Sequence, residues 1–245
     1  MTINEIADRY YAFILQATPE VSYFSGVAIA HHDGISDNSP QGLARIQSVE
    51  DGLLPQLHSL AEQQQIGTTE WITHAYLLQK IQSDVALRAC RMELWNISQM
   101  GGWHSGYAQI ARLQPVGTAL LRAESLARWA KFPAFVDQEI INLKMGLQAG
   151  YSAPKAVVRR VIGQIDGLLD LDTEQSPFFA PAVKDNNDEF VESTRQLVES
   201  GIYPALQRYR KFLASSYMGA AREALSVTEN PGGRECYEAS LRRYT

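Results

Sequence analysis

Residues 198–245 read VESGIYPALQRYRKFLASSYMGAAREALSVTENPGGRECYEASLRRYT. Apolar side chains recur in the first half of this stretch at three- and four-residue steps, at Ile202, Leu206, Tyr209 and Leu213. This spacing lines up one face of an α-helix and therefore predicts a long amphipathic helix. Pro204 lies inside the pattern, and because proline has no backbone N–H, we expect a kink there.

The second half of the stretch predicts a turn followed by a short terminal helix. Asn-Pro-Gly-Gly at 230–233 is a strong turn signal. After it, Cys236, Tyr237 and Leu241 form one apolar stripe, with Arg234 and Arg242 on the same short helix. Such a stripe, continuing to the last residues of the sequence, favours further polypeptide that packs against it.

The same periodicity runs through the rest of the chain and predicts an all-α fold. Serine or threonine before proline or an acid marks several helix starts, as at Ser39-Pro40 and Thr68. The helices are expected at 2–18, 19–26, 39–65, 68–94, 107–113, 118–132, 132–150 and 152–169. A cap at Asp188 is expected to begin the long helix described above. Pro55 is expected to kink or divide its helix, and Phe132-Pro133 is expected to begin a new helix.

Two segments break the helical pattern. Residues 28–40, AIAHHDGISDNSP, are rich in turn-forming residues and predict a loop. Residues 94–106, LWNISQMGGWHSG, predict an extended insert followed by a glycine turn. We therefore expect an irregular multi-helix array of eight to ten helices over residues 1–245, with kinked helices, one extended insert and a sub-boundary near 94–117.

Composition excludes several classes of protein. The 245 residues are 45% hydrophobic and 20% charged, as in ordinary globular domains, and the net charge of −5 argues against a nucleic-acid partner. No apolar run approaches the roughly 18 residues of a membrane span. The first residues lack the basic-then-apolar pattern of a signal peptide, so we expect a cytoplasmic protein whose two cysteines, Cys90 and Cys236, are reduced.

A series of motifs gives the sequence a family resemblance. The motifs are SYFSGV, HHDGISDNSP, WNISQMGGW, QPVGT, the run RAESLARWAKFPAFVDQEIINLKMGLQAGYSAPKAVVRRVIGQIDGLL, SPFFAPA, PALQRYRKFLASSYMGAARE and NPGGRECYEASLRRYT. In this order they resemble the bacterial family catalogued as domain of unknown function 885. Members are about twice as long as this chain, and the family is similar to zinc-dependent peptidases of the gluzincin type.

The resemblance implies that this chain corresponds to the amino-terminal half of such a protein. The family's metal site is expected in the carboxy-terminal half, which has a His-Glu pair, a further His and a later Glu. The sequence here contains no such motif. The resemblance therefore implies no metal cofactor in this chain, zinc in the other half, and that half as its partner. It also implies a peptide substrate, and an exposed apolar face that permits self-association.

The histidines themselves argue against a complete metal site. Zinc needs three or four His, Cys, Asp or Glu ligands, usually with two close together on one helix. The five histidines are His31, His32, His58, His74 and His104, and none stand three or four residues apart. We therefore predict no catalytic residue and no metal ligand in this chain.

Two clusters are candidate substrate contacts. His31, His32 and Asp33 form the most polar loop, which is either a solvated turn held by local hydrogen bonds or the edge of a cleft. The second cluster comprises Asn96, Gln99, Gly101, Gly102 and Trp103. Its extended backbone could pair with a peptide, since glycine permits close approach, or it is a buried connector whose amides satisfy neighbouring backbone.

Three functions remain open. The chain is the cleft-forming helical half of a zinc-dependent hydrolase and is inactive alone, or it is a stand-alone binding or scaffold protein without catalysis. The third possibility is a different enzyme that joins the His31–Asp33 loop to the Trp95–Trp103 segment. A ligand held between those two segments would favour the third possibility over the first two.

Overall fold

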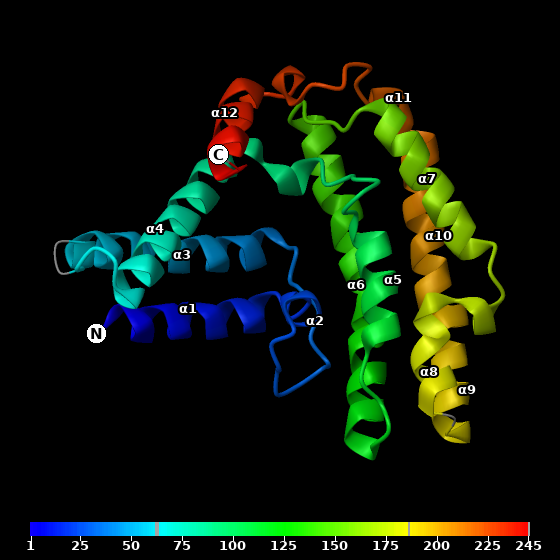
Figure 1. The fold of residues 1–245 in the computed structure, drawn as a ribbon. Coiled ribbons are helices and arrows are strands. Elements are labelled where there is room, and N and C mark those ends of the chain that lie inside the picture. Colours follow the sequence, from blue (N-terminus) through cyan, green and yellow to red (C-terminus); the bar gives the residue numbers. More distant parts are fainter. Residues whose placement is uncertain (62–63, 186, 245) are drawn as a thin grey trace. The chain divides into compact units, whose positions relative to one another are not determined.

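The fold is all-α. The computed structural model describes residues 1–61, 64–185 and 187–244. Twelve α-helical segments occur in this part of the chain, and α9, α10 and α11 join end to end through π-helical turns, which leaves ten helices (Figure 1). No β-strand occurs among the described residues. The expected irregular array of kinked helices is confirmed.

The helices follow one another with short connections. Their bounds are α1 Ile3–Ala17, α2 Val21–Ser25, α3 Pro40–Leu60, α4 Thr69–Leu87, α5 Trp103–Leu113, α6 Ala119–Gln148, α7 Lys155–Leu169, α8 Ala180–Asp185, α9 Asp188–Leu197, α10 Tyr203–Phe212, α11 Met218–Ala220 and α12 Gly233–Tyr244. The π-helical turns are Val198–Ile202 and Leu213–Tyr217, and 3-10 turns occur at Arg88–Cys90, Met92–Leu94, Thr173–Gln175, Pro177–Phe179 and Val227–Glu229.

Several helix starts are where the sequence predicted them, because the capping side chain is local. The Ser39 hydroxyl accepts a hydrogen bond from the Gly42 N–H at 3.1 Å, and Thr68 caps α4 in the same way. The predicted cap at Asp188 is wrong by one residue. The Asn187 side chain accepts from the Phe190 N–H at 3.0 Å, and Asp188 is the first residue of the helix.

The predicted division of residues 118–150 at Pro133 is wrong, since α6 runs unbroken from Ala119 to Gln148 with Pro133 inside it. Proline removes one helical hydrogen bond, which costs about 3 kcal/mol or more in an exposed helix. Phe132 and Val136 on either side of the proline are fully buried. This burial of apolar surface holds the helix together across the missing bond.

Near Pro204 the helical geometry changes as expected for a proline. The π-helical turn Val198–Ile202 ends two residues before it, and Pro204 is the second residue of α10. The prediction that helix α5 begins at Tyr107 is wrong, because it begins at Trp103, four residues earlier. The irregular insert is therefore shorter than predicted.

Two compact units make up the chain. Unit 1 comprises Met1–Ala17, Asp37–Met92 and Ser226–Thr245, and unit 2 comprises Thr18–Ser36 and Glu93–Leu225. In unit 1, α1, α3 and α4 pack around a small apolar core, and α12 packs on α4. The buried members of this core are Ile3, Ile6, Tyr10, Leu53, Leu57, Leu77 and Ile81.

A disulfide in unit 1 corrects the expectation of two reduced thiols. Cys90, at the end of the turn after α4, is bonded to Cys236 on α12, and both residues are buried. The bond joins residues 146 positions apart in sequence. Sequence spacing alone gave no sign of the pairing, because both cysteines stand singly in segments that only the fold brings together.

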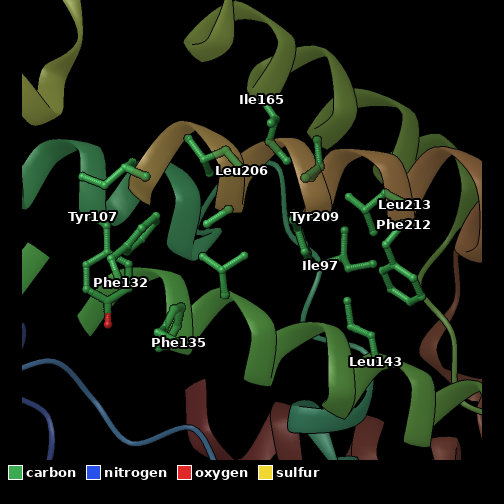
Figure 2. Packing of buried hydrophobic residues seen from close by; sticks show 14 of the residues in the cluster. Ile97, Tyr107, Phe132, Phe135, Leu143, Ile165, Leu206, Tyr209, Phe212 and Leu213 are labelled. Atoms are coloured by element: carbon green, nitrogen blue, oxygen red, sulfur yellow. The ribbon is translucent and has the colours of Figure 1, made fainter. Parts of the chain in front are cut away.

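The larger core lies in unit 2. Helix α10 lies between α6 and α7 and contributes buried side chains to both (Figure 2). Aromatic rings from α5 and α6 fill one end, where Tyr107, Phe132 and Phe135 meet edge to face or stacked. This core fixes the positions of α6 and α7, to which the segments with the candidate residues are hydrogen-bonded.

Candidate functional site

The His31–Asp33 loop is attached to helix α6 of unit 2. The His31 Nδ1 lies 2.9 Å from Glu124 Oε1, and the His32 backbone N–H donates to Glu124 Oε2 at 3.1 Å. Glu124 is buried, and the hydrogen bond from His31 lowers the pKa of its carboxyl. One carboxylate therefore holds two consecutive residues of the loop.

His32 turns away from His31 to other partners. Its Nδ1 lies 2.7 Å from the Tyr23 hydroxyl, and its carbonyl accepts from the Gln114 side chain at 3.2 Å. Burial lowers the pKa of the His32 imidazole, and the positive charge of Arg128 lowers it further. Arg128 is fully buried, with its guanidinium 4.7 Å from the centre of the Tyr23 ring. His32 is therefore part of the packed layer beneath the loop.

Asp33 forms the third attachment. The Lys131 ammonium donates to the Asp33 carbonyl at 2.8 Å and to its carboxylate at 3.2 Å. Partial burial opposes ionisation, but the hydrogen bond and charge of Lys131 leave the pKa of Asp33 below its usual value. His31, Asp33 and Glu124 line a shallow hollow of about 410 Å³ beside α6. Within it, the His31 side chain is 72% exposed and so remains accessible.

The second cluster is attached further along α6 and to α7. The Asn96 side chain donates to Glu139 at 3.2 Å, and Glu139 is buried. The Gln99 carbonyl accepts from the Gln164 side chain on α7 at 2.9 Å. Gly101 is exposed, and a side chain built there would meet no atom within 4 Å.

Gly102 and Trp103 have packing roles. A Cβ on Gly102 would lie 2.2 Å from the Ser98 carbonyl oxygen and 2.5 Å from the His104 ring, so only glycine fits this approach. Trp103 begins α5, and its ring centre lies 4.8 Å from Tyr209 and 5.6 Å from Phe135. The close approach that the glycine permits is therefore made by the Ser98 backbone and the His104 ring of the same chain.

The two clusters are attached at distant points. Glu124 and Glu139, which hold the first and second cluster, are fifteen residues apart on the same helix. A rise of 1.5 Å per residue separates them by about 22 Å along the axis. An enzyme centre that joins the His31–Asp33 loop to the Trp95–Trp103 segment needs reacting groups within a few ångströms. The structure does not bring them together.

No cluster of three or more His, Cys, Asp or Glu side chains that could hold a metal ion occurs in the described part of the chain. The described side chains therefore do not fit a catalytic zinc ion. No helix among these residues is long and apolar enough to cross a membrane.

Sequence reasoning missed a pocket between α5 and α7. Its lining includes His104, Gln109 and Arg112 on α5 and Gln164 on α7. The sequence placed the start of this helix at Tyr107, which left His104 in the insert and hid its alignment with Arg112. In a helix that begins at Trp103, His104, Ala108 and Arg112 are spaced four residues apart and share one face.

Comparison with known proteins identifies the family. The model of the bacterial proteins of unknown function called DUF885 matches residues 19–245. This chain belongs to that family. No curated protein matches the DUF885 chain.

A solved structure shares the fold. The crystal structure of the putative lipoprotein from Colwellia psychrerythraea is similar with a TM-score of 0.76 and 13% sequence identity. The match covers 98% of the DUF885 chain and 45% of the lipoprotein chain. The chain thus spans less than half the length of this relative, and at this identity the likeness concerns the fold alone.

Proposed function

We propose that this DUF885 chain is the helical, cleft-forming part of a longer zinc-dependent hydrolase and is inactive alone. The observation that carries the proposal is the coverage of the solved relative, which matches nearly all of this chain with less than half of its own length. The family resemblance adds the reaction class, since the motifs in this chain are similar to those that precede the metal-binding half of zinc peptidases.

The chain's own residues would bind substrate and not activate it. Because the described residues hold no group of metal ligands, the metal ion and the general base would be supplied by polypeptide outside residues 1–245. Among the candidate contacts, His31 and Gly101 are the most accessible, whereas Gly102 and Trp103 are packed against neighbours. We propose His31, Asp33 and Gly101 as the contacts with a peptide.

The exposed face of α12 would pack against the other half of the same longer protein. On α12, Tyr237 and Leu241 stand four residues apart on one face and remain about half exposed, at 49% and 47%. Exposed apolar side chains at helical spacing are typical of a face that packs against another helix. Self-association through the same face is the alternative for the isolated chain.

The test begins with the reading frame beyond codon 245. We expect it to continue into a helix with a His-Glu motif, and we expect the longer product to bind zinc and to hydrolyse peptides. The 245-residue chain, purified in the same way, should hold less than stoichiometric zinc and show no hydrolysis. Equal activity and equal metal content in both products would refute the proposal.

A stand-alone binding or scaffold protein is the second candidate, and the disulfide favours it. Within unit 1, the Cys90–Cys236 bond ties α12 to the turn after α4, so α12 is held in place by residues of this chain. Hydrogen exchange of α12 in the isolated chain tests this candidate. Slow exchange throughout α12, together with a stop codon after Thr245, would support it; exchange at the rate of an unfolded peptide would count against it.

The compartment is a separate part of the proposal. The cytoplasmic location expected from the sequence stays a prediction, but disulfides persist mainly in oxidising compartments. The Cys90–Cys236 bond therefore favours an exported protein, and the relative's name, a lipoprotein, agrees with this. Thiol labelling of the protein in its native cell extract tests the point, because free Cys90 and Cys236 there would restore the cytoplasmic interpretation.

A further inference from the structure

A pocket of about 440 Å³ opens between α5 and α7 of unit 2, beside the second cluster predicted from the sequence, whose Gln99 carbonyl accepts a hydrogen bond from Gln164 of the pocket. Five residues of α5 form one wall, namely His104, Ser105, Ala108, Gln109 and Arg112. Gln164 and Leu168 of α7 and the buried Pro177 form the rest. Its volume is in the range of pockets that hold small organic molecules.

The histidine of this pocket has a defined protonation pattern. The Gln99 carbonyl can only accept, so the Gln164 amide must turn its nitrogen toward it, at 2.9 Å. The Gln164 oxygen then faces His104 Nε2 at 2.9 Å and accepts a hydrogen bond from its N–H. His104 is 2% exposed, and burial lowers the pKa of its imidazole, whereas the hydrogen bond with Gln164 acts in the opposite direction. Hydrogen bonds thus join His104 and Gln164 of the pocket to the neighbouring Gln99 segment.

The charge of the pocket has one sign. Arg112 is exposed, no described residue forms an ion pair with its guanidinium, and no carboxylate is among the lining residues. Lys184 of α8 donates to the Arg112 carbonyl, which brings a second cation to the same end. On α7, Arg160 lies one turn before Gln164 and is exposed. Of the eight residues that line the pocket, Arg112 carries the formal charge, and it is positive in a chain whose net charge is −5.

We propose that this pocket binds a small organic carboxylate that carries a short apolar group, such as the C-terminal residue of a peptide. The planar guanidinium of Arg112 is suited to a carboxylate, which it can hold with two parallel hydrogen bonds. The Gln109 and Gln164 side chains supply amide groups for a peptide bond. Leu168 and Pro177 supply the apolar surface. The proposal does not depend on the hydrolase function.

The experiment uses the full 245-residue chain and two matched probes. N-acetyl-leucine has the carboxylate, and N-acetyl-leucinamide has the same side chain with a neutral amide in its place. The readout is the ¹⁵N and ¹H signals of the five histidine rings, among which His104 lines the pocket. We expect N-acetyl-leucine to shift the His104 signals saturably and the amide probe to bind at least about tenfold more weakly, the minimum for a lost charged hydrogen bond.

A pair of variants tests the role of Arg112. Arg112→Ala should weaken N-acetyl-leucine binding at least about tenfold, whereas Arg159→Ala, which removes an equal charge from an exposed position on α7 outside the lining, should leave it within about twofold. The free Arg112→Ala protein should keep the wild-type His104 signals, which shows that the pocket has folded.

Three results would overturn the proposal. One is the absence of any saturable shift at His104, and another is equal binding of the carboxylate and amide probes. The third is equal loss in Arg112→Ala and Arg159→Ala, because it would mean that net charge and not the pocket attracts the anion. Inorganic phosphate and acetate serve as comparison anions. If acetate bound as tightly as N-acetyl-leucine, Leu168 and Pro177 would contribute nothing to affinity, and the proposed apolar group of the ligand would be wrong.

Discussion

Helix α6 crosses the backbone of Leu94 so closely that Gly146 tolerates no side chain. A Cβ built on Gly146 would lie 1.8 Å from the Leu94 carbonyl oxygen, whereas ordinary contacts begin at 3.4 Å. Either α6 or the Leu94 segment would therefore have to move by roughly 1.6 Å to accept alanine. The obstacle is backbone and cannot rotate away as a flexible side chain would.

The expected loss in Gly146→Ala is the difference between two opposing effects. Overpacking costs typically 1–3 kcal/mol, and we take the upper end, about 3 kcal/mol, because backbone must shift. Alanine favours the helix over glycine by about 1 kcal/mol. The net result is a free energy of unfolding lowered by about 2 kcal/mol, which for a chain of this size lowers Tm by about 4–8 °C.

Gly163→Ala on α7 is the matched control, since a Cβ there would meet no atom within 4 Å. The same chemical change should then raise the free energy of unfolding by up to about 1 kcal/mol. Urea unfolding followed by tryptophan fluorescence reports mainly on unit 2, which contains Trp95, Trp103 and Trp129 of the four tryptophans. Equal changes of either sign in the two variants would refute the close crossing.

Three further predictions concern the disulfide, the loop and the insert. Reduction of the disulfide should lower the free energy of unfolding of unit 1 by about 2–5 kcal/mol, and Cys236→Ser should lower it equally. The measurement is Tm with and without dithiothreitol. The Tm of Cys236→Ser should not change further when the reductant is added. The folded-state pKa of Glu124 is depressed, so its contribution to stability is present above about pH 4.5 and lost as pH falls below that value. The Tm difference between wild type and Glu124→Gln should shrink below pH 4.5, and a constant difference would contradict the His31 contact. Trp103→Ala should cost about 3–5 kcal/mol in urea unfolding if the ring is core, and an unchanged midpoint would return Trp103 to the candidate contacts.

Local features of the fold could be predicted from the sequence. The Ser39 and Thr68 caps and the turn at 230–233 depend on residues within one helical turn, and each is present. Pro133 shows where local reasoning fails. Proline favours a helix start, but this preference is outweighed by the burial of Phe132 and Val136 beside it. These two side chains pack in a core to which helices distant in sequence also contribute.

The candidate site was predicted less well, for the same physical reason. The residue types at 31–33 and 96–103 identified polar segments, but their partners lie on α6 and α7, out of reach of any spacing rule. The pocket beside His104 needed two facts together, the true start of α5 and the position of Gln164 sixty residues later. A sequence pattern supplies neither.

The Cys90–Cys236 bond also constrains how the protein is made. The whole of residues 93–225 lies between the two cysteines, so the first three helices of unit 1 leave the ribosome long before the helix that completes their covalent ring. At about 5–20 residues per second, Cys236 is synthesised several seconds or more after Cys90. In the mature molecule, one proteolytic nick between the cysteines yields fragments that migrate together on a gel until the sample is reduced.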